Sequence, residues 1–378
     1  MTPPDLALSP IAGGDFAASG RPRAAPRPGR PARVLYAPVA GGEGSGERLR
    51  SEAIAAAVAQ LAPDTEQALA GPIEPGVRGV AWLPLPDSPT RAPAELIQAI
   101  ARFRPDWLVF DGNVRSAVLG EARRRGLSTV FIASRPSAVR RALPLRRRCR
   151  FDRVWLLETA PPEGMARLVM KIRESLAGPH KVRRWASLHR APDDAAALDR
   201  LARLGIAPGA FLLSCPGGGG YRRDGMPSGA WLAQAAARAG ARLGLPVLAL
   251  AAASAPAGTH LLGRLEQPEL LALVRLSRAA LLGGGSVLVQ AITEGALCVA
   301  VPWQAEQRRR IERLARRDLA CAGIGDIDAT AERLQRLAQD PALRAQRTRA
   351  IASSALGNGL QEAAAALAAL PVRQPGIA

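Results

Sequence analysis

The chain has 378 residues and a formal net charge of +19, which comes almost entirely from arginine, since only two of its 51 basic residues are lysines. Hydrophobic residues make up 48% and charged residues 22%, so the chain can bury enough apolar surface to fold, and its length favours two domains of ~100–200 residues each. Aromatic residues make up 4% and do not alternate with basic ones, which argues against a nucleic-acid partner, although the positive charge attracts nucleotide diphosphates and anionic lipid.

Compartment signals in the sequence are few. Four cysteines lie far apart and form no CxxC pair, which is typical of a reduced setting. The first residues contain an acid and prolines instead of a basic region followed by an apolar core, so we expect no signal peptide. The longest apolar stretches fall well short of the ~18 residues that a membrane span needs. We expect a cytoplasmic protein that is soluble, or at most peripheral at the inner membrane face.

The first half of the chain predicts a Rossmann-like domain over residues 32–178. Residues 1–31 are rich in Pro, Ala, Gly and Arg without apolar periodicity, and we predict that they form a disordered leader. The domain opens with a strand at 33–39, a glycine loop at 41–47 and a helix at 48–61. The later predicted elements are helix 94–103, strand 107–110, helix 117–125, strands 129–133 and 153–157, and helix 163–176.

A second Rossmann-like domain is predicted over residues 179–370, with the segment 179–184 as the junction. It opens with a strand at 211–215 and a glycine run at 216–225. Its other predicted elements are helix 229–243, strand 246–250, a short strand near 261, helix 269–276, strand 279–282, helix 287–294 and strand 298–302, followed by helices. Strands that alternate with helices predict parallel sheets covered on both faces. The predicted fold class is therefore α/β, with two Rossmann-like domains facing a cleft, and ligands are expected at the carboxyl ends of the strands.

The segment GGGSVLVQAITEGALCVAVPWQAEQ, residues 283–307, is the most specific motif. A glycine turn that enters a helix presents unpaired N–H groups and the positive end of the helix dipole, which together bind a diphosphate. In order and spacing, the turn, the helix, Gly295, Pro302 and Gln307 resemble the donor-binding signature of the MurG-like glycosyltransferases of family 28. The resemblance implies the GT-B fold and a nucleotide-sugar co-substrate, with UDP as the expected nucleotide and no other cofactor.

The same resemblance assigns candidate side chains to the donor. The family's ribose-binding glutamate aligns with Gln290, and Glu294, one helical turn later, is the alternative. The glycine run after strand 211–215 is expected to approach the donor closely, with Arg222 or Arg223 neutralising phosphate. The full predicted donor set is Gly217, Gly218, Gly219, Gly220, Arg222, Gly283, Gly284, Gly285, Ser286, Gln290, Glu294, Gln304, Glu306 and Gln307.

The first glycine loop, GGEGSGE, holds the candidates for a catalytic base. It lacks the spacing of a dinucleotide fingerprint, because Glu47 stands where the last glycine is needed, which disfavours NAD. The loop resembles the N-terminal loop of the same fold and the GSGHxxR loop of related sugar-nucleotide hydrolases, with Glu47 in place of the histidine and Arg50 as the arginine. Transfer to a hydroxyl needs a base, and a partly buried carboxylate can serve. The candidates are Glu47, then Glu43, then Asp111; capping of the following helix explains Glu47 equally well.

Residues 135–150 contain seven arginines and no acid. A solvated helix face is the default interpretation of such a run. The alternative is a patch that contacts an anionic membrane or a phosphorylated lipid acceptor. The arginines are Arg135, Arg140, Arg141, Arg146, Arg147, Arg148 and Arg150, of which Arg141, Arg146, Arg147 and Arg148 are the patch candidates. The three histidines are scattered without the spacing of a metal site, and we expect a metal-independent mechanism.

The predicted function is transfer of a hexose-type sugar from a nucleotide sugar to a hydroxyl acceptor, lipid- or glycan-linked. One alternative is a sugar-nucleotide hydrolase or epimerase on the same fold, which the GSGE sequence and Arg50 suggest. The other is a catalytically degenerate GT-B protein that binds its ligand without turnover, which the missing histidine and Gln290 suggest.

Overall fold

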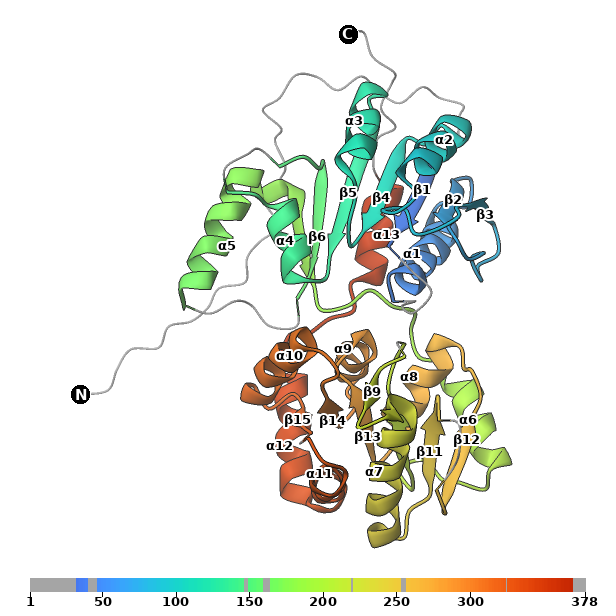
Figure 1. The fold of residues 1–378 in the computed structure, drawn as a ribbon, viewed down its shortest axis with the longest axis vertical. Coiled ribbons are helices and arrows are strands. Elements are labelled where there is room, and N and C mark those ends of the chain that lie inside the picture. The colour runs from blue at the N-terminus through green and yellow to red at the C-terminus, as the bar shows by residue number, and fades with distance from the viewer. Residues whose placement is uncertain are drawn as a thin grey trace, which may run out of the picture.

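The computed structural model describes residues 32–39, 46–145, 149–158, 164–218, 220–252, 256–323 and 325–369. They form two α/β domains, one above the other in Figure 1, each built on a parallel sheet with helices on both faces. The predicted fold class is therefore confirmed. Within the described ranges, no helix is long and apolar enough to cross a membrane.

The first domain contains a seven-stranded parallel sheet with the order β3-β2-β1-β4-β5-β6-β7. The strands are β1 (Arg33–Pro38), β2 (Glu66–Gly71), β3 (Val80–Pro84), β4 (Trp107–Asp111), β5 (Ser128–Ala133), β6 (Arg153–Leu157) and β7 (Val182–Trp185). The helices are α1 (Gly46–Leu61), α2 (Pro93–Phe103), α3 (Ser116–Arg124), α4 (Pro136–Ala142) and α5 (Gly164–Ala177), and a 3-10 turn at Pro179–Lys181 precedes β7.

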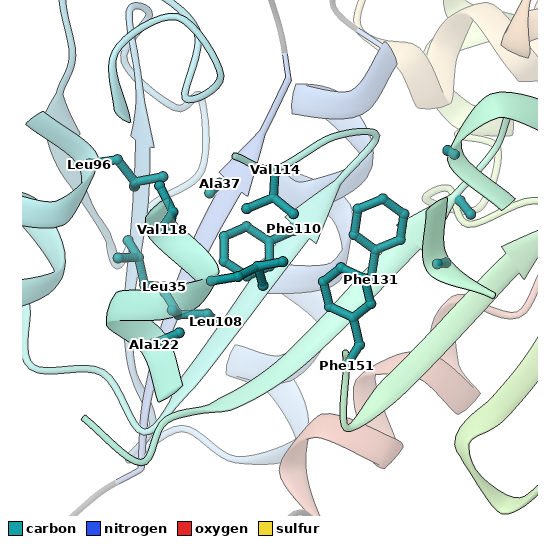
Figure 2. Packing of buried hydrophobic residues seen from close by; sticks show 14 of the residues in the cluster. Leu35, Ala37, Leu96, Leu108, Phe110, Val114, Val118, Ala122, Phe131 and Phe151 are labelled. Atoms are coloured by element: carbon teal, nitrogen blue, oxygen red, sulfur yellow. The ribbon is translucent and has the colours of Figure 1, made fainter. Parts of the chain in front are cut away.

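Both faces of this sheet are buried because side chains alternate along each strand. On β4, Leu108 and Phe110 face one core cluster, whereas Trp107 and Val109 face the other. Figure 2 shows the first cluster, where the rings of Phe131 and Phe151 stack with centroids 4.5 Å apart. This two-sided burial explains why the strands appear in the sequence as continuous apolar runs.

The second domain contains a six-stranded parallel sheet with the order β12-β11-β8-β13-β14-β15. The strands are β8 (Leu212–Cys215), β11 (Val247–Leu250), β12 (Thr259–Leu262), β13 (Ala279–Gly283), β14 (Cys298–Val301) and β15 (Cys321–Ala322), and β9 (Arg222–Arg223) and β10 (Met226–Pro227) form a separate hairpin. The helices are α6 (Asp194–Arg203), α7 (Ser228–Leu243), α8 (Gln267–Leu276), α9 (Ser286–Thr293), α10 (Ala305–Arg316), α11 (Ile327–Gln339) and α12 (Pro341–Ala352).

The domain boundary differs from the predicted one in two places. The segment 179–184, interpreted as a junction, contains most of β7, which pairs with β6 at the edge of the first sheet. The last helix, α13 (Leu360–Ala368), returns to the first domain, where its buried face completes the cluster that lines α1 (Figure 1). The chain therefore passes between the domains twice, because the alanine-rich face of α1 needs a second helix to cover it.

Candidate functional site

Helix N-termini from both domains meet at the cleft between the sheets. The strand β1 leads into α1, which begins at Gly46, and β13 leads into α9, which begins at Ser286. A Cβ atom built on Gly46 would lie 3.3 Å from Ser286 Oγ, so the first turns of the two helices approach each other across the cleft. No side chain caps α9 at Gly285. The first described turn of α1 therefore lies beside the N-terminus of α9, whose positive end and uncapped N–H groups favour an anion.

The three glycines of the predicted donor turn differ in how much space a side chain would have. A Cβ on Gly283 would lie 2.1 Å from the carbonyl oxygen of Pro216, and one on Gly284 would lie 2.8 Å from Gln307 Cβ. Gly283 therefore lets the end of β13 pack against the segment after β8, and Gly284 lets the following turn pack against α10. A Cβ on Gly285 would meet no atom within 4 Å. Among the three, Gly285 is the one beside open space, next to Ser286 at the start of α9.

The segment after β14 holds the predicted sugar-binding side chains. Gln307 Oε1 accepts a hydrogen bond of 2.8 Å from the backbone N–H of Trp303, so this amide stabilises the turn into α10. Gln304 is exposed at the N-cap of α10. Glu306 lies 3.6 Å from the Arg310 guanidinium, and its side chain is 40% exposed. Gln304 and Glu306 are therefore accessible at the helix start, whereas Gln307 has a structural partner.

The two candidates for the ribose contact both have partners inside the protein. Gln290 is buried, and its Oε1 accepts a hydrogen bond of 3.1 Å from Gln267 Nε2. Glu294 is the C-cap of α9 and lies 2.8 Å from Nε2 of His189. An eight-residue helix rises ~12 Å, so Glu294 lies at the end of α9 opposite Ser286. Both predicted ribose-binding side chains are therefore engaged within the protein.

The glycine run after β8 leads to an arginine that sequence analysis left unresolved. Gly217 has a φ of +80°, which glycine adopts without strain, and Gly219 lies outside the described residues. Arg222 donates to the carbonyl oxygen of Gly225 within the β9–β10 hairpin. Arg223 instead donates to the carbonyl oxygen of Pro302 at 2.7 Å. Arg223, rather than Arg222, thus reaches the end of β14.

Two tryptophans hold the Arg223 guanidinium in place. Its carbon atom lies 5.0 Å from the ring centroid of Trp231 and 4.8 Å from that of Trp303, which are cation–π distances. Burial lowers the pKa of Arg223, and the nearby Arg308 lowers it further. The sandwich fixes a cation beside the carboxyl ends of β8, β13 and β14.

Arg310 is a site residue that the sequence analysis missed. Its Nη1 donates to the carbonyl oxygen of Gly284 at 2.9 Å, so the guanidinium lies directly behind the glycine turn. Burial lowers the pKa of Arg310 most, Glu306 opposes this effect, and the cations Arg135 and Arg50 of the first domain add to it. Arginines of both domains therefore repel one another across the cleft, and a bound anion would relieve that repulsion. Arg310 lies one helical turn after Gln307, and this spacing could have identified it in the sequence.

The base candidates fall into different environments. Glu47 lies in the first turn of α1, its side chain is 12% exposed, and its Oε1 is 3.1 Å from Arg135 Nη2. Asp111 is fully buried, and both its oxygens accept hydrogen bonds of 2.7 Å from Arg50. Burial raises the pKa of Asp111 to about 6, against the opposing effect of Arg50. Glu43 lies outside the described residues. Of the two described carboxylates, Glu47 is the one at the cleft.

The arginine run is described in part. Arg140 and Arg141 are exposed on α4, and Arg135 extends to Glu47. Three of the four patch candidates, Arg146, Arg147 and Arg148, lie outside the described residues.

Asp326 and Asp328 form a DxD sequence, the arrangement in which two carboxylates can bind a metal ion, at the start of α11. Asp326 caps α11 by accepting from the N–H of Ala329, and Asp328 pairs with Arg238 at 2.5 Å. The described residues contain no cluster of His, Cys, Asp and Glu side chains that could hold a metal ion.

Two cavities lie beside the linker between the domains rather than at the glycine turn. One, of about 550 Å³, is lined by Glu294, Asp194 and Arg275 among others. The other, of about 380 Å³, lies between α1, residues 190–194 and α13. Neither cavity is lined by Gly285 or Ser286, and the first-domain loop over residues 40–45 lies outside the described residues.

Solved structures share this two-domain arrangement, although no protein-family model and no curated protein matches the sequence. The spinosyn forosaminyltransferase SpnP superposes with a TM-score of 0.59 at 15% identity, over 89% of this chain and 98% of its own. A UDP-glucosyltransferase from Polygonum tinctorium, capable of glucosylating indoxyl, gives 0.62 at 14% identity, over 89% and 98%. A protein from Listeria monocytogenes, assigned as a UDP-N-acetylglucosamine 2-epimerase, gives 0.58 at 12%, over 89% and 95%. The chain therefore has the GT-B fold.

The raised pKa of Asp111 predicts a pH dependence of stability. The folded-state pKa of about 6 lies above the unfolded value of ~3.9, so the folded protein holds this proton more tightly. The contribution of Asp111 to stability is then present in full below pH ~4 and lost as the pH rises through ~6. Relative to Asp111→Asn, the wild-type free energy of unfolding should fall by about 1–3 kcal/mol between pH 4 and 7, measured by urea denaturation. Asp64→Asn, which removes an exposed carboxylate, is the control, and a pH-independent difference for Asp111→Asn would contradict the prediction.

Proposed function

We propose that this chain is a glycosyltransferase that moves a sugar from a nucleotide sugar, with UDP as the nucleotide, to a hydroxyl acceptor. The observation that supports it most is the meeting of two helix N-termini with arginines of both domains at one cleft. A nucleotide diphosphate is an anion of the size and charge that this arrangement favours. The motif at residues 283–307 supports membership of the MurG-like group within the GT-B proteins.

In this proposal the diphosphate lies at the N-terminus of α9. The N–H groups at Gly285 and Ser286 bind its oxygens, and Arg310 and Arg223 stabilise the charge that grows as the diphosphate leaves. Gln304 and Glu306 contact sugar hydroxyls. These fixed charges can replace a metal ion, so the mechanism we propose is metal-independent.

Glu47 is the proposed general base. It lies in the first turn of α1, next to the donor helix, and accepts the proton of the acceptor hydroxyl as that oxygen attacks the anomeric carbon and the nucleotide diphosphate leaves. Arg135 Nη2 lies 3.1 Å from Glu47 Oε1 and positions the carboxylate in its partly buried place.

The donor site is tested by ligand binding. UDP should bind the wild-type protein and raise its melting temperature, because a ligand that binds only the folded state stabilises it. Arg310→Gln should weaken UDP binding by roughly tenfold, since one charge-assisted contact is lost. Arg309→Gln, an exposed neighbour on the same helix, is the matched control and should bind as the wild type does. Calorimetric titration measures both, and absence of binding by UDP, GDP and dTDP sugars alike would refute the donor site.

Product analysis separates transfer from its rivals. A sugar-nucleotide hydrolase or epimerase is supported by the GSGE sequence and by the likeness to the Listeria protein. Such an enzyme releases or converts the sugar without any acceptor. A degenerate protein binds the donor and forms no product. We expect Glu47→Gln to reduce transfer by about 10²-fold or more while UDP affinity stays within threefold, as befits a general base. Glu95→Gln on the exposed face of α2 is the control.

The acceptor side of the proposal involves a membrane. The helix α5 exposes four large apolar side chains that share one face: Met165, Leu168, Ile172 and Leu176. Arg167 and Lys171 are exposed beside them. Arg173 of α5 donates to the carbonyl oxygen of Leu143 just after α4, which joins this face to the arginine run. A helix with an apolar face and basic flanks is suited to an anionic lipid surface. We propose that this surface brings the chain to a lipid-linked or glycan-linked acceptor.

The α5 surface is tested with vesicles. The wild-type protein should sediment with phosphatidylcholine vesicles that contain anionic phosphatidylglycerol and not with phosphatidylcholine alone. Leu168→Ser with Ile172→Ser should lower the partition coefficient by roughly tenfold, because apolar area no longer enters the interface. Leu198→Ser with Leu261→Ser removes two leucines of similar exposure elsewhere and is the matched control. Equal binding of the two double variants would rule the surface out.

A further inference from the structure

The two chain passages between the domains run side by side and are bonded to each other. Gly359 N–H donates to the carbonyl oxygen of Ser187 at 3.0 Å. The Asn358 side chain holds the peptide of His189 from both sides, since its Oδ1 accepts from His189 N at 3.2 Å and its Nδ2 donates to His189 O at 2.7 Å. Any rotation of one domain against the other would have to bend these two paired segments, which we call the hinge.

The side chain of His189 links this hinge to the end of α9. The ring is fully buried, with Nε2 2.8 Å from Glu294 Oε1 and Nδ1 2.9 Å from Ser187 Oγ. Carboxylate oxygens accept hydrogen bonds, so we assign the tautomer in which the Nε2–H group donates to Glu294 and Nδ1 accepts from the Ser187 hydroxyl. Serine, histidine and glutamate thus form one continuous hydrogen-bonded chain.

We propose that His189 is a positioning residue that fixes the direction of α9 relative to the hinge. This inference rests on the proposed function, in which the N-terminus of α9 binds the donor diphosphate. The helix has eight residues and no side-chain cap at its N-terminus. Its C-cap, Glu294, is hydrogen-bonded to the buried ring of His189. The ring contacts Ser187 of the first passage, and the backbone of His189 is bonded to Asn358 of the second. The direction in which α9 presents its N–H groups is therefore set at its far end.

A hydrolytic role for the same three side chains does not fit the geometry. The order serine–histidine–carboxylate matches that of a nucleophilic triad. However, Ser187 is 6% exposed, and the adjacent cavity is lined by Glu294 and by neither Ser187 nor His189. The hydroxyl that would attack a substrate is thus nearly buried and lies outside the lining of that cavity. The chain of hydrogen bonds is thus suited to holding α9 and not to acyl transfer.

Hydrogen exchange tests the positioning role without any ligand. His189→Leu keeps a side chain of similar volume but loses the hydrogen bond to Glu294. The amide hydrogens of α9 should then exchange at least about tenfold faster. His189→Gln can still donate to Glu294 and should restore the rate to within about threefold. The exposed His180→Leu is the matched control. Unchanged exchange in α9, or equal acceleration in β4 of the first domain, would overturn the proposal, because the first result removes the link and the second shows a general loss of stability.

Donor affinity gives the second readout. His189→Leu should weaken UDP binding and raise the KM for the donor by about tenfold, with kcat changed by less than about threefold, since the group never contacts the reacting atoms. Glutamine at the same position should recover the affinity. If α9 loosens while UDP affinity stays at the wild-type value, the positioning role is refuted. If the wild-type protein binds no nucleotide, the proposed function fails, and the exchange experiment still decides whether His189 fixes α9.

Discussion

Every strand in both large sheets runs parallel to its neighbours, and this single constraint determines where the chain can do chemistry. Parallel strands place all their carboxyl ends at one edge of the sheet, and the helix that follows each strand begins at that edge. Because the two edges face each other, the starts of α1 and α9 meet across the cleft. Positive potential accumulates there from helix dipoles and from Arg50, Arg135 and Arg310 before any ligand is considered.

Each of these arginines has an acidic neighbour. Asp111 binds Arg50 with both oxygens, and Glu47 lies beside Arg135. Arg310 has a more distant acid, at 3.6 Å, and donates to a carbonyl oxygen of the glycine turn. An anionic ligand would add negative charge to this group of arginines. The proposed function therefore depends first on donor binding and only then on a catalytic base.

The sequence predicted the elements whose two faces are both buried, because a continuous apolar run such as that of β4 has few alternatives. It did not predict β2 and β3, whose short alanine-rich and half-exposed segments lack such a run, or β7, which contains two arginines. Within the candidate site, the glycine turn and the start of α10 were predicted from spacing. The roles of Arg223 and Arg310 were not, since their partners Pro302 and Gly284 are brought close only by the order of the strands. Similarly, the hydrogen bond between Gln290 and Gln267 could not be predicted from a local motif, because the two residues lie far apart in the sequence.

The return of α13 to the first domain has a consequence for how the protein is made. The ribosome releases the first domain long before it synthesises Leu360–Ala368, so the apolar face of α1 that this helix covers stays open to water while the second domain is being made. The first domain therefore matures last, although it is synthesised first. Any fragment that ends within the second domain carries an incomplete first one, and the two halves of this chain are one folding unit despite their separate sheets.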